Sequence, residues 1–234
     1  MIKAVLFDLD GTLLPMDQDL FIKTYFASLS KKLASHGYDK DKLVPAVWEG
    51  TKAMMTNDGS RTNEQAFWEF FCATFGEKAK EDMPLFEDYY KNEFAAVKEV
   101  CGYYPQAADV IKAVKNKGLK AVLATNPLFP AVATQNRIRW AGLNPEDFEL
   151  YTTYEDYTYC KPNLEYYQQI LEKLGLKGEE CVMVGNDVTE DMATEKLGMQ
   201  TFLLTDCIIN RENKDISAYN HGGFDQLIEF INNL

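Results

Sequence analysis

The stretch IKAVLFDLDGT, residues 2–12, decides how the rest of the chain is interpreted. Its apolar residues are Ile2 and the unbroken run from Ala4 to Phe7, which is typical of a strand buried on both faces when a glycine-containing turn follows. Parallel α/β sheets bind ligands at the carboxyl ends of their strands, so Asp8 and Asp10 are expected at the mouth of a pocket. Two carboxylates this close repel each other unless they share a proton or hold a cation. A solvated turn is the alternative, because Asp and Gly are common turn residues.

The composition is that of a globular protein, with 46% hydrophobic and 26% charged residues in a chain of 234. This length suits one large domain, or one domain with a smaller companion. The 24 basic and 36 acidic residues give a formal charge of −12, which disfavours binding to nucleic acid or to an anionic membrane surface. A small anionic substrate remains compatible with this charge, because a local cluster of cation, lysine and helix N-termini can outweigh the overall field.

The cysteines indicate the compartment. Five of them are scattered along the chain, and no pair has the spacing of zinc ligands. This usage is typical of reduced thiols in a cytoplasmic protein. Met1 leads directly into the first strand and no apolar run has transmembrane length, so we expect neither a signal peptide nor a membrane span. Whether the protein is a monomer or a homodimer stays open.

Residues 16–98 differ from the rest of the chain. They form amphipathic segments of helical period, separated by Asn, Asp, Gly and Pro. We therefore predict an all-helical cap domain over 16–98, inserted into a core made of residues 1–15 and 99–234. A polar loop over 56–61 interrupts the cap, and it is expected to present side chains to a substrate, namely Asn57, Asp58 and Arg61.

From Gly102 onward, strands and helices alternate. The pattern predicts strands within 119–126, 148–155, 181–187 and 200–206, helices between them, including one over 189–198, and a last helix over 222–234. Alternation at this spacing favours right-handed crossovers and a parallel sheet between two layers of helices. The predicted fold class is therefore α/β, with a Rossmann-like parallel core and a helical insertion after the first strand.

Polar residues stand at the ends of the later strands. Thr125 and Asn126 follow a buried run, where a hydroxyl, an amide and backbone N–H groups can hold anionic oxygens. Lys161 precedes a predicted helix and can neutralise a phosphate. A capping role for Thr125 and a plain surface position for Lys161 are the simpler alternatives.

An acidic cluster follows the strand within 181–187. Asn186, Asp187 and Asp191 lie at its carboxyl end and open the next helix. Carboxylate and amide oxygens are hard ligands of the kind that Mg²⁺ takes. The sequence thus predicts a magnesium site at the same edge of the sheet as Asp8.

Taken in order, these stretches resemble the haloacid dehalogenase superfamily of hydrolases. The resemblance rests on DLDGT at 8–12, on Thr125 after a strand, on Lys161 ahead of a helix and on the acidic cluster, and it covers nearly the whole chain. Most members are Mg²⁺-dependent phosphatases, and the helical insertion is similar to their cap. The resemblance implies a small phosphorylated metabolite as substrate and the following roles: nucleophile for Asp8, general acid and base for Asp10, phosphate binding for Thr125, Asn126 and Lys161, metal binding for Asp8, Asp10, Asn186 and Asp187, and an outer role for Asp191.

One position departs from the pattern of this superfamily. Its last motif usually has Asp directly after Gly, whereas Asn186 follows Gly185 here and Asp187 comes next. Either the Asn186 side-chain oxygen binds the ion, or Asp187 takes over that role. The residues alone leave both alternatives open.

The chemistry that fits these residues is hydrolysis in two steps through an aspartyl-phosphate on Asp8. Asp10 would protonate the leaving alkoxide and then deprotonate the attacking water. Members that remove halide lack an acid at the position of Asp10, so we do not expect a dehalogenase. A sugar phosphomutase of the same superfamily would keep both acids and is one alternative. A catalytically weak binding or regulatory member is the other.

Overall fold

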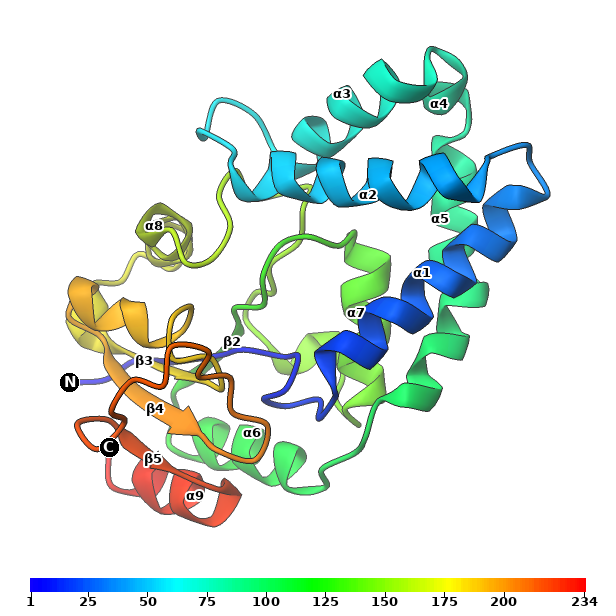
Figure 1. The fold of residues 1–234 in the computed structure, drawn as a ribbon. Coiled ribbons are helices and arrows are strands. Elements are labelled where there is room, and N and C mark those ends of the chain that lie inside the picture. Colours follow the sequence, from blue (N-terminus) through cyan, green and yellow to red (C-terminus); the bar gives the residue numbers. More distant parts are fainter.

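The core of the protein is a five-stranded parallel sheet. The structure, a computed structural model, describes all 234 residues. The strands lie in the order β2-β1-β3-β4-β5, and all neighbours are parallel (Figure 1). Their bounds are Ala4–Phe7 for β1, Lys120–Leu123 for β2, Cys181–Gly185 for β3, Gln200–Leu204 for β4 and Asn220–Gly222 for β5. This confirms the predicted α/β fold with a parallel core.

Helices cover both faces of the sheet. Side chains of β1 alternate between two cores: Val5 and Phe7 join the one that α6 and α9 cover, and Ala4 and Leu6 join the one that α8 covers. Each β1 residue is fully buried, which explains why this strand is apolar throughout. The helical elements of the core are α6 (Gln106–Asn116), α7 (Ala131–Trp140), α8 (Leu164–Leu174), α9 (Phe224–Asn232) and the short 3₁₀ helices η2 (Pro145–Asp147), η3 (Gly178–Glu180) and η4 (Met192–Leu197).

Two predictions about these elements were wrong, and one strand was missed. Residues 148–155 form no regular strand: three backbone hydrogen bonds join this segment to β2, but it makes a single bridge, between Tyr151 and Leu123. The short strand β5 precedes α9 and was not expected, since its residues are mostly exposed and polar. The segment 189–198 contains the 3₁₀ helix η4 in place of a regular helix.

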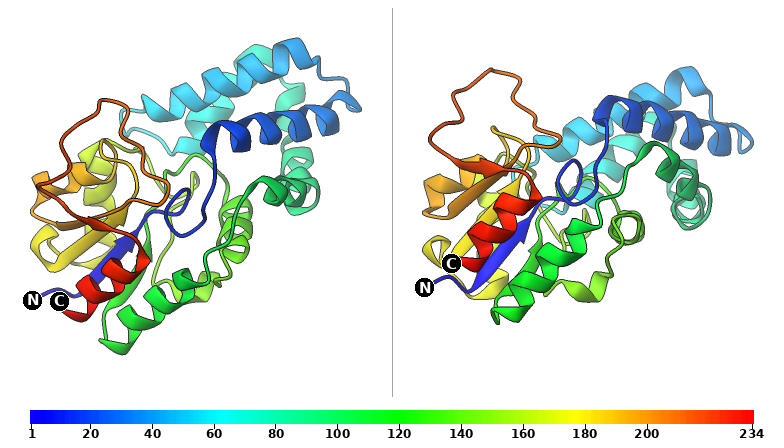
Figure 2. Two further views of the ribbon diagram at one scale, coloured as in Figure 1. Left: turned by 60° about the horizontal axis from the view of Figure 1, so that its bottom comes forward. Right: turned by 90° about the horizontal axis from the view of Figure 1, so that it is seen from below.

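A group of helices lies between β1 and α6. Its members are α1 (Gln18–Ala34), α2 (Lys40–Met55), α3 (Asn63–Phe75), α4 (Lys78–Glu81), α5 (Met83–Lys91) and the 3₁₀ helix η1 (Glu93–Val100). Figure 2 shows them beside the sheet, joined to it by the segments before α1 and after η1. Aromatic side chains fill the interior of this helical group, where Phe71, Tyr89 and Phe94 are fully buried.

One contact between this helical group and the core is made by the fully buried side chain of Asn63, at the start of α3. Its Nδ2 donates to the carbonyl oxygens of Pro127 (3.2 Å) and Tyr159 (3.3 Å). The backbone N–H groups of Asn63 and Glu64 donate to Tyr157 O (2.8 Å) and Tyr154 O (2.9 Å). The start of α3 is therefore fastened to the core segment that leads to Lys161.

None of the helices has the length and apolar character that crossing a membrane requires. All five cysteines are free, as their scattered positions predicted.

Candidate active site

Strand register brings the ends of three strands together. Phe7, the last residue of β1, is paired with Leu123 of β2 on one side and with Val184 of β3 on the other. The residues that follow these positions therefore meet at one edge of the sheet, as the sequence predicted for Asp8, Thr125 and Asn186.

The turn after β1 needs a glycine at position 11. Gly11 has a φ of +88°, and a Cβ added there would collide with the side-chain amide of Asn186. Any other residue would strain the backbone and push Asn186 away. The turn thus holds the chain that carries Asp8 and Asp10 against the end of β3.

The carboxylate of Asp8 is held by the protein through both of its oxygens. Lys161 Nζ donates to Oδ1 at 2.8 Å, and Thr12 Oγ1 lies 3.0 Å from Oδ2. Thr12 Oγ1 also lies 3.1 Å from Asn186 Oδ1, so its single proton is shared between two acceptors. Asp8 is 7% exposed and lines a cavity. Its position, charge and fixed orientation fit a nucleophile.

Lys161 lies behind Asp8, on the segment before α8. Its ammonium is almost completely buried and also donates to Asp191 Oδ1 at 2.6 Å. Burial works to lower the pKa of Lys161, but Asp191 and Asp8 overcome it and raise this pKa well above the ordinary value. Burial, countered by Lys161, raises the pKa of Asp191 to about 7. The ammonium stays charged and serves both carboxylates.

Gly185 and Asp187 position Asp191 for this contact. A Cβ on Gly185 would collide with the Asp191 carboxylate, so only glycine allows their close approach. Asp191 Oδ2 accepts a hydrogen bond from the Asp187 backbone N–H at 3.1 Å. The outer role predicted for Asp191 matches its contacts with Lys161 and with the loop that carries Asp187.

Asp10 forms an ion pair that sequence reasoning missed. Its Oδ2 contacts the guanidinium of Arg137, which is completely buried on α7 and packs over the ring of Phe129 at 4.5 Å. The Asp10 Oδ1 atom is buried and has no hydrogen-bond partner in the chain. Burial outweighs Arg137 and raises the pKa of Asp10, with the neighbouring Asp8 adding to the rise. A carboxyl with a raised pKa is suited to carry a proton.

Thr125 and Asn126 follow β2, as predicted. The backbone carbonyl of Thr125 accepts hydrogen bonds from Thr152 Oγ1 (2.6 Å) and Tyr166 OH (2.7 Å), which fix the strand end. Asn126 Oδ1 accepts the Lys161 backbone N–H at 3.3 Å, and its Nδ2 donates to Glu190 Oε2 at 3.4 Å. Both residues line the cavity beside Asp8.

The contacts of Asn186 and Asp187 differ. Asn186 Nδ2 donates to Cys207 O at 2.7 Å, and its Oδ1 lies at the Thr12 hydroxyl. Asp187 Oδ1 instead accepts the backbone N–H groups of Thr189 (2.7 Å) and Glu190 (2.9 Å). The amide oxygen of Asn186 therefore shares the Thr12 hydroxyl with the Asp8 carboxylate, while one oxygen of Asp187 is used to shape its own loop.

This donor set fits a hard cation such as Mg²⁺. It consists of a carboxylate oxygen of Asp8, the Asn186 side-chain oxygen and the Asp10 backbone carbonyl, to which no backbone N–H donates. The set contains too few clustered acidic side chains to form a metal site from His, Cys, Asp and Glu alone. Substrate oxygens or water would have to complete the coordination.

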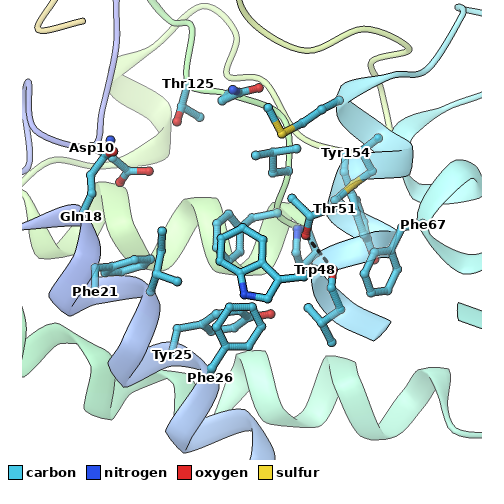
Figure 3. A pocket seen from close by; sticks show the side chains of 18 of the residues that line it. Asp10, Gln18, Phe21, Tyr25, Phe26, Trp48, Thr51, Phe67, Thr125 and Tyr154 are labelled. Atoms are coloured by element: carbon cyan, nitrogen blue, oxygen red, sulfur yellow. Dashed lines mark hydrogen bonds between the residues drawn. The ribbon is translucent and has the colours of Figure 1, made fainter. Parts of the chain in front are cut away.

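A cavity of about 360 Å³ opens above these residues, between the sheet edge and the helical group. Figure 3 shows Asp10 and Thr125 on one side of it and the rings of Phe26 and Trp48 on another. Lys161 lies behind this wall and is not part of it.

The loop over 56–61 does not reach this cavity, so the structure does not support its predicted contact with the substrate. Asn57 is buried and donates to Arg61 O (2.8 Å) and to Asn63 Oδ1 (3.0 Å). Asp58 accepts from the Ser60 hydroxyl at 2.6 Å, and Arg61 pairs with Glu69 at 3.3 Å. The polar groups of this loop are engaged locally, beside the joint at Asn63.

Sequence reasoning missed the roles of Thr12, Arg137 and Glu190. Thr12 belongs to the stretch that opened the sequence analysis, and its place four residues after Asp8 was the available signal. Arg137 gave no local signal, because a basic residue in a helix normally indicates a solvated face. Glu190 lines the cavity, and burial raises its pKa.

The fold and the site define an α/β protein with a parallel core, in which the carboxylate of Asp8 lies at the end of the first strand and lines a cavity. The family model of haloacid dehalogenase-like hydrolases matches residues 2–196, and the chain belongs to this family. The resemblance predicted from the motifs is thereby confirmed.

A relative of known name covers the whole chain. This protein is 27% identical to a glyceraldehyde 3-phosphate phosphatase of Methanocaldococcus jannaschii, over 100% of this chain and 99% of that protein. Two solved structures share the fold. A HAD phosphatase from Thermococcus onnurineus has a TM-score of 0.60 and 21% identity, with 98% of each chain covered. The putative HAD-hydrolase YfnB of Bacillus subtilis, solved bound to magnesium, has a TM-score of 0.56 and 18% identity, with 99% of each chain covered.

Proposed function

We propose that the protein is a Mg²⁺-dependent phosphomonoesterase that acts on a small phosphorylated metabolite through an aspartyl-phosphate on Asp8. The observation that carries this proposal is the Asp8 carboxylate, which faces the cavity while Lys161 and Thr12 hold its two oxygens. The phosphatase name of the archaeal relative agrees with this activity.

The first step transfers the phosphoryl group to Asp8. A carboxylate oxygen of Asp8 forms a bond to phosphorus while the bond from phosphorus to the leaving oxygen breaks, and Asp10 gives its proton to that oxygen. In the second step water attacks the phosphorus of the aspartyl-phosphate, and Asp10 takes the proton of that water. Inorganic phosphate leaves and the Asp8 carboxylate is restored.

The surrounding residues stabilise the charge of the phosphoryl group. Thr125 and Asn126 lie on the cavity wall and are suited to hold its oxygens, while Lys161 offsets the charge of Asp8 from behind. Asp8, the Asp10 carbonyl and the Asn186 side chain would hold Mg²⁺, with Asp187 next to them. When bound, the ion neutralises charge that grows on the phosphoryl oxygens.

Trapping of the intermediate tests this proposal. The purified protein should hydrolyse an aryl phosphate in the presence of Mg²⁺, and acid quenching should leave phosphate covalently attached. Asp8→Asn should lower kcat by about 10⁴-fold or more and abolish the covalent label, because the nucleophile is lost. Asp109 is an exposed acid on α6, and Asp109→Asn is the control, which should keep both the turnover and the covalent label. A label that persists in Asp8→Asn, or no Asp8-dependent turnover, would overturn the proposal.

Further features of the organisation stay proposals. We place the cap at residues 16–98 and the core at 1–15 and 99–234, in agreement with the helical run from Gln18 to Val100. The free cysteines favour a cytoplasmic location. The formal net charge of −12 disfavours nucleic acid as a partner. A monomer and a homodimer are both compatible with these features.

A further inference from the structure

The wall of the cavity opposite Asp8 is strongly apolar. Its lining on the helical group comes from α1, α2, α3 and α5, and it includes these large side chains: Phe21, Phe26, Trp48, Met55, Phe67 and Trp68. Figure 3 shows the ring of Trp48 beside that of Phe26, with Tyr25 and Phe21 further along α1. The ring centroids of Phe26 and Trp48 are 5.3 Å apart. A ligand that occupies this cavity meets aromatic faces and thioethers.

Part of this apolar surface is not covered by the protein itself. Trp48 is 47% exposed and Met55 is 50% exposed, although both are large hydrophobic side chains on the same helix, α2. Both also line the cavity. Core packing does not account for them, because residues that only fill a core are buried. They lie where an apolar ligand would cover them.

The charged residues around the cavity disfavour a leaving group that carries a second anionic group. Arg211 is the only basic residue that lines the cavity, and this arginine is exposed in the loop between β4 and β5. The helical group instead contributes two carboxylates, those of Glu64 and Glu87. A second phosphate or a carboxylate on the leaving group would face these acids without a lysine or arginine from the helical group to bind it.

We propose that the phosphate ester accepted by this site carries an uncharged leaving group with an extended apolar or aromatic part, which binds against Trp48, Phe26 and Met55. This inference rests on the proposed phosphatase function, since it names the substrate class of the same site. Phosphate specificity comes from the sheet edge, and leaving-group specificity comes from the aromatic wall.

Three alkyl phosphates with leaving alcohols of similar acidity provide the test: n-propyl phosphate, n-hexyl phosphate and the hexyl ester with a terminal carboxylate. Each methylene buried against the wall raises kcat/KM by up to about fourfold, so hexyl should exceed propyl phosphate by at least about tenfold. The carboxylate analogue has the same chain as the hexyl ester and adds only charge. Its kcat/KM should be at least about tenfold lower than that of the hexyl ester.

Two cap variants make the test specific. Trp48→Ala should lower the hexyl-to-propyl ratio of kcat/KM by at least about fivefold, because it removes apolar wall. Leu20→Ala is the matched control: Leu20 is 45% exposed on α1, lies outside the cavity and should leave the ratio unchanged.

The outcomes separate this inference from the proposed function. All three esters could be hydrolysed in an Asp8-dependent way, with kcat/KM for propyl phosphate and for the carboxylate analogue equal to or higher than kcat/KM for hexyl phosphate. In that case the proposed apolar specificity is wrong and the phosphatase function stands. A hexyl preference that Trp48→Ala leaves intact also overturns the assignment to this wall. If no phosphate ester, aryl phosphate included, is hydrolysed, the proposed function fails and this inference fails with it.

Discussion

The guanidinium of Arg137 forms an ion pair with the carboxylate of Asp10, 127 residues earlier in the chain. Arg137 is fully buried, and its planar group lies over Phe129 on one side of this pair. The second nitrogen donates to Thr134 Oγ1 at 3.3 Å. Helix α7 therefore fixes the acid that is proposed to carry the proton, although it contributes no residue of the family motifs.

Replacing Arg137 should cost stability that a second replacement restores. Arg137→Met leaves the Asp10 carboxylate without its counter-charge, and loss of one partner of a buried pair typically costs about 3–5 kcal/mol. Asp10→Asn in the same chain removes that unpaired charge, so the double variant should be more stable than Arg137→Met alone. Urea unfolding of the parent, the two single variants and the double variant measures this coupling. Additive effects of the two changes would show that the pair does not act as a unit.

Asn186 and Asp187 should differ in their effect on the requirement for Mg²⁺. The Asn186 amide oxygen shares the Thr12 hydroxyl with Asp8, whereas Asp187 Oδ1 holds two backbone N–H groups. We expect Asn186→Ala to raise the Mg²⁺ concentration for half-maximal activity by about tenfold or more, and Asp187→Ala to raise it less. Titration of activity with Mg²⁺ measures both. The reverse order would assign the ligand to Asp187.

Asn63→Ala should loosen the joint between α3 and the core. The change removes the side chain that donates to Pro127 O and Tyr159 O and accepts from Asn57 Nδ2. Buried groups left without partners cost about 1–3 kcal/mol. The free energy of unfolding in urea should therefore fall more for Asn63→Ala than for Thr62→Ala. Thr62 caps the same helix from an exposed position, where a cap is worth about 1 kcal/mol. Equal losses would mean that Asn63 acts only on its helix.

Glu64 should make stability depend on pH. Burial raises its pKa, and the nearby carboxylates of Glu155, Glu87 and Asp156 add to the rise. The folded chain therefore keeps this proton to a higher pH than the unfolded chain. The stability that Glu64 contributes is fully present below its unfolded pKa and is lost as the pH rises through its folded pKa.

Glu64→Gln removes this loss. The variant should be more stable than the parent at pH 7, and the gap should narrow toward about pH 3, where the acid is protonated in both states. Urea midpoints over this pH range provide the measurement. A gap that is constant with pH, or that widens toward low pH, would contradict the expected sign.

The parts of the site that lie in local sequence patterns could be predicted. Asp8 and Asp10 stand directly after an apolar run, and strand register alone brings Thr125 and Asn186 to the same edge. Arg137 could not be predicted in this way, because its contact with Asp10 depends on how α7 packs in three dimensions. No residue spacing within α7 indicates that Arg137 lies next to Asp10.

Two errors show what local patterns leave undecided. The residues over 148–155 are rich in Tyr and Thr, which favour strands, and three backbone hydrogen bonds join them to β2, but only Tyr151 forms a bridge. The loop over 56–61 is polar and joins two helices, a common place for binding residues. Its side chains are instead engaged in turns and in packing next to Asn63. A polar loop that supports a joint has the same composition as one that binds a ligand.

The two contacts that hold Asp8 have a consequence for how the reaction is prepared. With one oxygen fixed by Lys161 and the other by Thr12, the angle at which this carboxylate meets phosphorus is set when the chain folds. The entropy of aiming the nucleophile has been lost before any ester arrives. The direction from which Asp8 attacks is therefore fixed. Competing esters are distinguished by how well their alcohol portions place the phosphorus atom along that direction.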